Sequence, residues 1–177
     1  MASWLTKMVG AGLRLDNLED LLVLELKDLY SAEQQLIKAL PQMSAAAHSP
    51  ELKSAFDQHL GETRRQKDRL EQAFQLLGCT AEAESCEAME GLIHEGSEII
   101  SAEGDPEVKD AALISAAQRV EHYEIAGYGC ARTFAMRLGR SDIADLLQRT
   151  LDEEGNADKI LTHIAESFVN QEAAAHS

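Results

Sequence analysis

Glutamate residues interrupt the apolar faces of four helical patterns in this chain, at positions where carboxylates could bind metal ions. In residues 16–47, steps of three and four place a row of leucines on one face, and Glu33 falls within that row. Residues 106–139 show the same arrangement around Glu124, and residues 141–170 show it around Glu154. The last pattern also predicts that Ile164 and Phe168 share the buried face.

The segment 50–78 differs, because the middle of its inward face is polar. His59, Thr63 and Gln66 occupy core positions there, and Glu62 lies one turn after His59. The acids in the four segments are at similar depths along their helices, so side-by-side packing predicts one polar level in the core. Glu121 lies three residues before Glu124 and Asp158 four residues after Glu154, so each adds a carboxylate on nearly the same face.

Six carboxylates at one level of a core require compensating charge. A buried ion costs several kcal/mol even after relaxation, and like charges in contact raise that cost. Two divalent cations would supply four positive charges, and two trivalent cations would balance all six acids. Oxygen ligands with one imidazole suit iron or manganese better than zinc or copper. The pattern therefore predicts a dinuclear metal site, with these candidate ligands: Glu33, His59, Glu62, Glu121, Glu124, Glu154 and Asp158.

A structural explanation competes with this prediction. A single glutamate on an apolar face is usually at a bend, paired with arginine, or assigned one position away from its true place. Arg65 and Arg119 are available as partners, and Glu153 could replace Glu154 if the last helix is rotated. Four interruptions at matching depth nevertheless favour a metal site.

Capping residues and glycines divide the chain into helices. Asp16 with Glu19 is typical of a capping box, and Ser49-Pro50 and Asp105-Pro106 are typical helix starts. Gly78 and Gly139 are expected to end helices, and Ser141 to cap the last one. Pro41 should kink or shorten the first helix. Residues 1–15 are interpreted as a lead-in, residues 16–170 as one bundle, and residues 171–177 as a disordered tail.

Loop lengths predict the topology. The first and second long helices are joined by a few residues, as are the third and fourth, so each pair should form an antiparallel hairpin. The hairpins are connected by residues 79–104, of which about 84–103 should form a shorter helix. The predicted fold is all-α: a ferritin-like four-helix bundle of two antiparallel hairpins with a long helical crossover.

Composition excludes several classes of protein. The chain has 177 residues, three prolines and a formal net charge of −15. Such a charge argues against a nucleic-acid partner, which would require a basic surface. The three cysteines form no C-x-x-C pair, and this spacing favours a reducing compartment. The first residues lack the pattern of a signal peptide or membrane span, so a cytoplasmic location is expected.

The sequence also resembles the YciE/YciF family of bacterial ferritin-like proteins linked to stress responses. The resemblance covers nearly the whole chain, from about Asp16 to Phe168, and is carried by DLYSAEQQLIKALP (28–41), HLGET (59–63), CEAMEGLIHE (86–95), DAALISAAQRVEHYEIAGYG (110–129) and TLDEEGNAD (150–158). It implies a cytoplasmic, dimeric bundle with a dinuclear metal site formed by the seven residues proposed above.

One departure from the wider ferritin-like superfamily concerns the imidazole ligand. That superfamily usually places E-x-x-H on two helices, whereas Arg65 follows Glu62 and Ala157 follows Glu154 here. The imidazole instead precedes its glutamate, in the order His59-x-x-Glu62. The predicted site is therefore richer in oxygen and poorer in nitrogen than usual.

The functional hypothesis is a protein that binds two iron ions and oxidises or sequesters Fe(II), with peroxide or oxygen as oxidant. A manganese site that dismutates peroxide would use much the same ligands. A non-catalytic helical bundle that binds partner proteins is a third possibility, and iron storage would require a hollow cage. Tyr123 and Tyr128 lie close to the acids, where a hydroxyl could hydrogen-bond a ligand, although half-buried aromatics are common at such positions.

Overall fold

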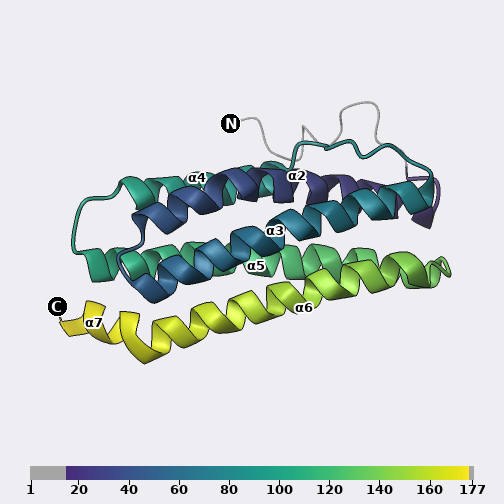
Figure 1. Ribbon diagram of the computed structural model, residues 1–177. Coiled ribbons are helices and arrows are strands. Elements are labelled where there is room, and N and C mark those ends of the chain that lie inside the picture. The colour runs from purple at the N-terminus through teal and green to yellow at the C-terminus, as the bar shows by residue number, and fades with distance from the viewer. Residues whose placement is uncertain (1–14, 176–177) are drawn as a thin grey trace.

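The computed structural model describes residues 15–175, and all of the regular structure in this range is helical. Its four long helices are α2 (Leu18–Ala46), α3 (Pro50–Leu77), α5 (Pro106–Arg137) and α6 (Ser141–Ile164). They lie side by side along one long axis (Figure 1). The predicted lead-in, apart from Leu15, lies outside the described residues. None of the described helices is both long enough and apolar enough to cross a membrane.

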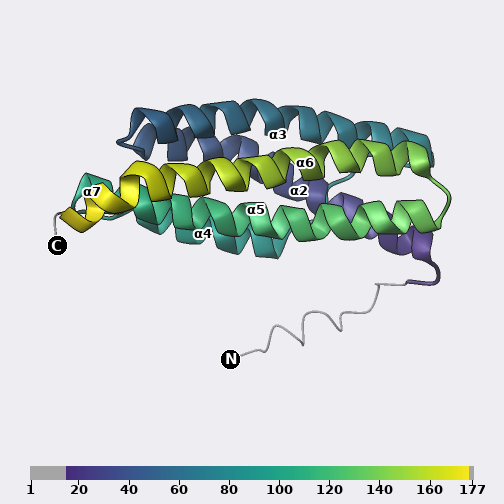
Figure 2. The same cartoon turned by 90° about the horizontal axis from the view of Figure 1, so that it is seen from below.

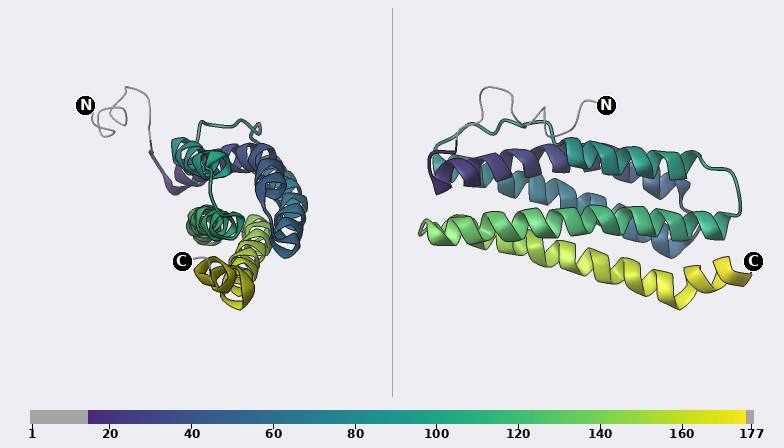
Figure 3. Two further views of the ribbon diagram at one scale, coloured as in Figure 1. Left: turned by 90° about the vertical axis from the view of Figure 1, so that its left-hand side faces the viewer. Right: turned by 180° about the vertical axis from the view of Figure 1, so that it is seen from behind.

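The long helices form a ring in which α2 packs on α3, α3 on α6, α6 on α5, and α5 on α2. The end-on view in Figure 3 shows this arrangement, and Figure 2, seen from below, shows the α5–α6 hairpin in front of α2. Because α2–α3 and α5–α6 are each joined by a short turn, both predicted hairpins are confirmed. The chain has the ferritin-like bundle that its loop lengths predict.

The crossover contains α4 (Glu87–Ser101), which packs against α2 and α5 on the outside of the ring. The helix predicted within residues 84–103 is thus confirmed. Its N-cap is Cys86, whose buried thiol accepts a hydrogen bond from the Met89 amide at 3.4 Å. Ser31 of α2 accepts from the Cys86 amide at 3.1 Å, so the start of α4 is fixed to the bundle.

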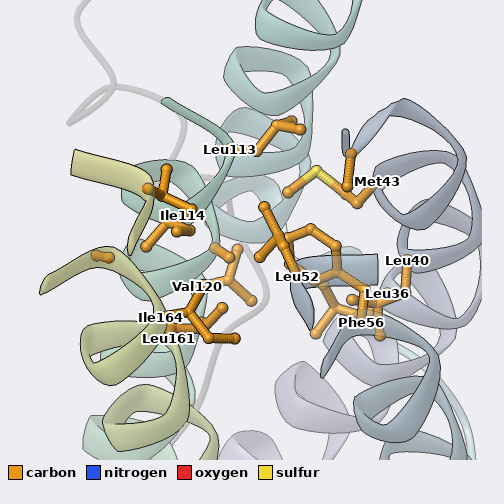
Figure 4. Close-up of a cluster of buried hydrophobic side chains, with 14 of the residues drawn as sticks. Leu36, Leu40, Met43, Leu52, Phe56, Leu113, Ile114, Val120, Leu161 and Ile164 are labelled. Atoms are coloured by element: carbon orange, nitrogen blue, oxygen red, sulfur yellow. The ribbon is translucent and has the colours of Figure 1, made fainter. Parts of the chain in front are cut away.

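The apolar interior is divided into two clusters. One contains Leu36, Leu40, Phe56 and Leu161, and Figure 4 shows such side chains from α2, α3, α5 and α6 converging. The other lies nearer the α5–α6 turn and includes Leu29, Leu70, Phe74, Tyr128 and Leu147. In every long helix the predicted acids or His59 fall between residues of the two clusters. The interrupted faces of the sequence therefore form one polar level across the bundle.

Three local predictions are corrected by the structure. The N-cap of α2 is Asn17, which accepts from the Asp20 amide at 2.9 Å, so the predicted box at Asp16 and Glu19 is shifted by one residue. Ser141 is already the first helical residue of α6 and does not cap it; the N-cap is Arg140, which has no side-chain capping bond. Pro41 does not shorten its helix, which continues to Ala46, because Pro41 is exposed and water can solvate the carbonyl left without a partner.

The C-terminal end also differs from the prediction. Residues Ala165–Val169 form a π-helical turn, and α7 (Asn170–Ala175) follows where a disordered tail was expected. The extra residue in the π turn shifts the register of the helix. Ala165 and Val169 are consequently buried, and Phe168 is 45 % exposed although periodicity had assigned it to the core.

One buried carboxylate outside the polar level connects the two hairpins. Asp110, in the first turns of α5, accepts hydrogen bonds from the amides of His48 at 2.8 Å and Ser49 at 2.6 Å, in the turn between α2 and α3. The side chain is 2 % exposed. Hydrogen bonds to a buried charged group contribute more to stability than neutral ones, and unpaired amides would be costly.

We therefore predict that Asp110→Ala lowers the free energy of unfolding by about 2–3 kcal/mol, as measured by urea denaturation. Glu103→Ala, at an exposed position just before α5, serves as the control and should change stability by less than about 0.5 kcal/mol. Equal effects of the two substitutions would contradict the role assigned to Asp110.

Candidate metal centre

Four side chains from three helices converge at the polar level. His59 of α3, Glu121 and Glu124 of α5, and Glu154 of α6 each offer one ligand atom, and these atoms lie within 4.8 Å of one another. The Nε2 atom of His59 is 3.3 Å from Glu121 Oε1 and 3.8 Å from Glu154 Oε2. All four residues are buried, and Glu124 and Glu154 are 0 % exposed. This cluster of four could hold a metal ion.

Glu33 of α2 lies beside the four-residue cluster and is also fully buried. The Tyr128 hydroxyl donates to Glu33 Oε1, which leaves Glu33 Oε2 without a hydrogen-bond partner among the described residues. Burial raises the pKa of Glu33, and repulsion from the charge of Glu154 raises it further. With Glu33, every long helix contributes an acid or the imidazole to one buried group.

Glu62 and Asp158, the other two predicted ligands, lie at the edge of the centre. Glu62 Oε2 is 3.7 Å from His59 Nδ1, and its side chain is 13 % exposed. Asp158 accepts from the Gln118 amide group at 2.9 Å and lies 3.3 Å from Nε2 of the exposed His122. Neither belongs to the cluster of four, so their assignment as ligands stays a prediction.

Arginine does not neutralise the buried acids. Among the described residues, no Lys or Arg forms an ion pair with Glu33, Glu121, Glu124 or Glu154. Arg119 instead contacts Glu95 at 3.2 Å on the surface. Arg69 makes two hydrogen bonds to Glu153, at 2.6 and 2.7 Å, and Glu154 rather than Glu153 belongs to the cluster of four. The alternative of arginine pairing therefore fails for the central acids.

Gln66, which occupied a core position in the sequence pattern, positions Glu154. Its side-chain amide donates to Glu154 Oε1 and, at 3.2 Å, to Glu153 Oε2. Glu154 Oε2 remains without a hydrogen-bond partner in the described structure and is turned toward His59. Tyr128 and Gln66 thus each hold one oxygen of an acid and leave the other available.

The buried acids are poorly suited to carry negative charge without a cation. Burial raises the pKa of Glu33, Glu121 and Glu124, and repulsion from neighbouring carboxylates raises it further. Burial lowers the pKa of His59, but the contact with Glu62 and the charge of Glu154 outweigh it, so the net shift is upward. Both His59 nitrogens and both Glu124 oxygens have no hydrogen-bond partner within residues 15–175. Such unsatisfied buried groups are typical of a ligand site.

Fold and centre together define a ferritin-like all-α bundle with a carboxylate-rich candidate metal site. The comparisons with known proteins agree on the family. The family model described as "Domain of unknown function (DUF892)" matches residues 17–174, and the chain belongs to this family. Protein YciF of Escherichia coli K12 is 43 % identical over 162 residues, which cover 91 % of this chain and 98 % of YciF.

Solved structures show the same relationship. The crystal structure of the E. coli stress protein YciF matches with a TM-score of 0.85 at 44 % identity, covering 88 % of this chain and 99 % of YciF. YcfI of Rhodopseudomonas palustris matches with a TM-score of 0.81 at 43 % identity, covering 83 % and 94 %. A Xanthomonas campestris protein at 22 % identity shares the fold, with a TM-score of 0.71 and coverage of 90 % and 99 %. The predicted resemblance to the YciE/YciF family is confirmed.

The raised pKa values predict that metal-free protein becomes more stable as the pH falls. Glu33, Glu121, Glu124 and His59 bind protons more tightly in the folded chain than in the unfolded chain, so their contribution to stability is lost as the pH rises through the folded pKa. Glu62 opposes this trend, because its contact with His59 lowers its pKa. The other candidate ligands with a resolved shift all have raised pKa values. The melting temperature of chelator-treated protein should therefore rise between about pH 8 and about pH 5.5.

Surface carboxylates would also respond to pH, and a matched variant separates their effect. Glu121→Gln/Glu124→Gln keeps the surface acids and removes two of the buried ones, so its melting temperature should depend less on pH. Saturating Mn(II) should reverse the native trend, because metal binding requires deprotonated ligands. Equal pH dependence in the native protein and the double variant would contradict the prediction.

Proposed function

We propose that this protein binds two iron ions at its centre and oxidises or sequesters Fe(II). The observation that carries the proposal is the convergence of four fully or nearly fully buried acids and one imidazole with unsatisfied ligand atoms. Hard carboxylate oxygens with a single nitrogen favour iron or manganese. Cations would also offset the repulsion that raises the pKa values of the acids.

The geometry favours a particular division of roles. His59, Glu121, Glu124 and Glu154 form the nucleus of the site, since their ligand atoms already lie together. Glu33 would extend it toward a second ion, and Glu154, which interacts with both His59 and Glu33, would help to hold both. Glu62 lies at the edge of the site, where it suits a residue that receives incoming cations.

The chemistry at such a site would be electron transfer from Fe(II). Dioxygen that takes one electron from each of two Fe(II) ions, together with two protons, leaves as hydrogen peroxide. Peroxide that takes the same two electrons and two protons becomes two water molecules. The chain's own contribution is to hold the acids in place, through Tyr128 and Gln66, and to exclude bulk water with the two apolar clusters.

The family resemblance supports two further parts of the proposal. The chain would act as a homodimer, and it would do so in the cytoplasm under stress, since the similar E. coli YciF is a stress protein. A manganese centre that dismutates peroxide, and a bundle without catalytic activity, are the outcomes that the experiments below distinguish.

Metal content is the first test. Protein purified without chelator or affinity tag should contain about two iron ions per chain by elemental analysis, and Glu124→Gln/Glu154→Gln should lose most of them. The double variant should also melt at a higher temperature than the metal-free native protein, because amides relieve the repulsion between the acids.

Glu90→Gln is the matched control, because it makes the same chemical change at an exposed position on α4 and should retain metal. A native protein that takes up neither Fe(II) without oxygen nor Mn(II) would refute the metal site. Two manganese ions per chain would favour the manganese alternative.

Turnover separates the remaining functions. Anaerobic protein loaded with Fe(II) should form Fe(III) on mixing with dioxygen or peroxide, with a time course followed by ultraviolet absorbance. Tyr128→Phe should retain the bound metal but slow this oxidation, since Glu33 loses the hydroxyl that holds it. Oxygen evolution from peroxide by the manganese-loaded protein would instead show dismutation, and neither reaction would occur in a purely structural bundle.

A further inference from the structure

A cavity beneath α4 reaches the candidate metal centre from the side opposite α6. It lies between α2, α4 and α5, has a volume of about 60 Å³, and is lined mainly by aliphatic side chains: Leu36, Leu40, Met43, Leu92, Ile100 and Val120. Several of these are labelled in Figure 4. His59 and Glu121 also line it, so two of the candidate ligands form part of its wall.

The two ends of the cavity differ in exposure. Gln42 is exposed and Ser97 is half-buried, so they mark the end near the surface. Their polar groups are occupied by backbone carbonyls of their own helices: Gln42 donates to Lys38 at 3.2 Å, and Ser97 donates to His94 at 2.7 Å. His59 and Glu121 are buried, and their unsatisfied polar atoms mark the inner end. The path between the two ends is apolar.

Size and polarity together select the occupant. About 60 Å³ is several times the space that one water molecule needs, but it is well below the roughly 150 Å³ of an engineered apolar cavity that binds benzene. Apolar walls do not replace the hydrogen bonds of water, peroxide or a hydrated cation. A small apolar molecule with no hydrogen-bonding requirement fits this space best.

A second, more polar approach exists between α3 and α6. A cavity of about 20 Å³ there is lined by Gln58 and Glu62 as well as by His59 and Glu121. The rest of its lining is apolar, but the carboxylates of Glu62 and Glu121 suit cations. Both cavities therefore reach His59 and Glu121, but from different sides, and the cavity between α3 and α6 has the more polar lining.

We propose that the cavity beneath α4 admits dioxygen to the metal centre, whereas cations enter past Glu62. This inference rests on the proposed function, because dioxygen is useful there only if Fe(II) is bound. It goes further by naming dioxygen as the oxidant that the chain is shaped to take, and α4 as the element that forms its path.

Gly96 provides a direct way to close the path. It is buried in the wall formed by α4, and a Cβ atom added to it would lie 3.8 Å from the Met43 sulfur, which is an ordinary contact. A leucine side chain at this position would start without a clash and project into the cavity. Gly91 lies in the same helix but is exposed, and a Cβ added there meets nothing within 4 Å. Gly91→Leu is therefore a matched control for Gly96→Leu.

The first experiment needs no metal. Xenon is an apolar probe that occupies such cavities, and its binding to the metal-free full chain can be followed by the xenon NMR chemical shift. Native protein and Gly91→Leu should shift the xenon signal in a saturable way, and Gly96→Leu should lose this shift. Circular dichroism confirms that each variant is folded. Absence of xenon binding to the native protein would overturn the proposal.

The second experiment measures oxidation of bound Fe(II). Gly96→Leu should need more dissolved oxygen than Gly91→Leu to reach half its maximal rate, while its iron stoichiometry and its rate with peroxide stay unchanged. An unchanged oxygen dependence despite lost xenon binding would overturn the dioxygen path and leave the proposed function standing. Failure of the native protein to bind iron would overturn the proposed function, and the dioxygen path with it, even where xenon binds.

Discussion

The burial of several carboxylates at one level of the bundle is the constraint on which the rest of this structure depends. Glu33, Glu124 and Glu154 are fully enclosed, and no arginine or lysine pairs with them in the described part of the chain. Removing such groups from water is costly, so the apolar clusters on either side must supply the compensating stability. The bundle therefore resembles two short cores joined by four continuous helices, with a polar layer between them that is stable only when its charge is balanced by protons or cations.

The residues around this layer orient the acids without neutralising them. Tyr128 and Gln66 are uncharged donors, and each engages one oxygen of an acid. Arg69 is held by Glu153, the residue next to Glu154, through two hydrogen bonds, so its charge is paired outside the cluster of buried acids. If Arg69 paired with Glu154 instead, it would compete with a metal ion for the same oxygens.

Much of this arrangement could be predicted from sequence. Helical periodicity determines which side chains face the core, and loop length determines which helices form antiparallel hairpins. The spacing around Glu33, Glu124 and Glu154 was sufficient to place them at one buried level. The spacing did not show whether Glu62 and Asp158 lie inside the cluster or at its edge. A side chain at the border of a helix's inward face can point either way. The π turn after Ile164 could not be foreseen either, since a single inserted residue leaves no signal in the preceding pattern, and it exchanged Phe168 for Val169 in the core.

The crossover shows how topology and chemistry are linked in this fold. Helices α3 and α5 run in the same direction, so the chain must return along the length of the bundle between them (Figure 1). A loop alone would meet that requirement, but it would leave the aliphatic side chains of α2 and α5 near Leu36 and Val120 facing water. Helix α4 covers them, buries Met89, and places Gly96 in the wall of the remaining space. The same segment that completes the connection thus forms the apolar wall beside His59 and Glu121, and the shape of that wall determines which molecules reach them.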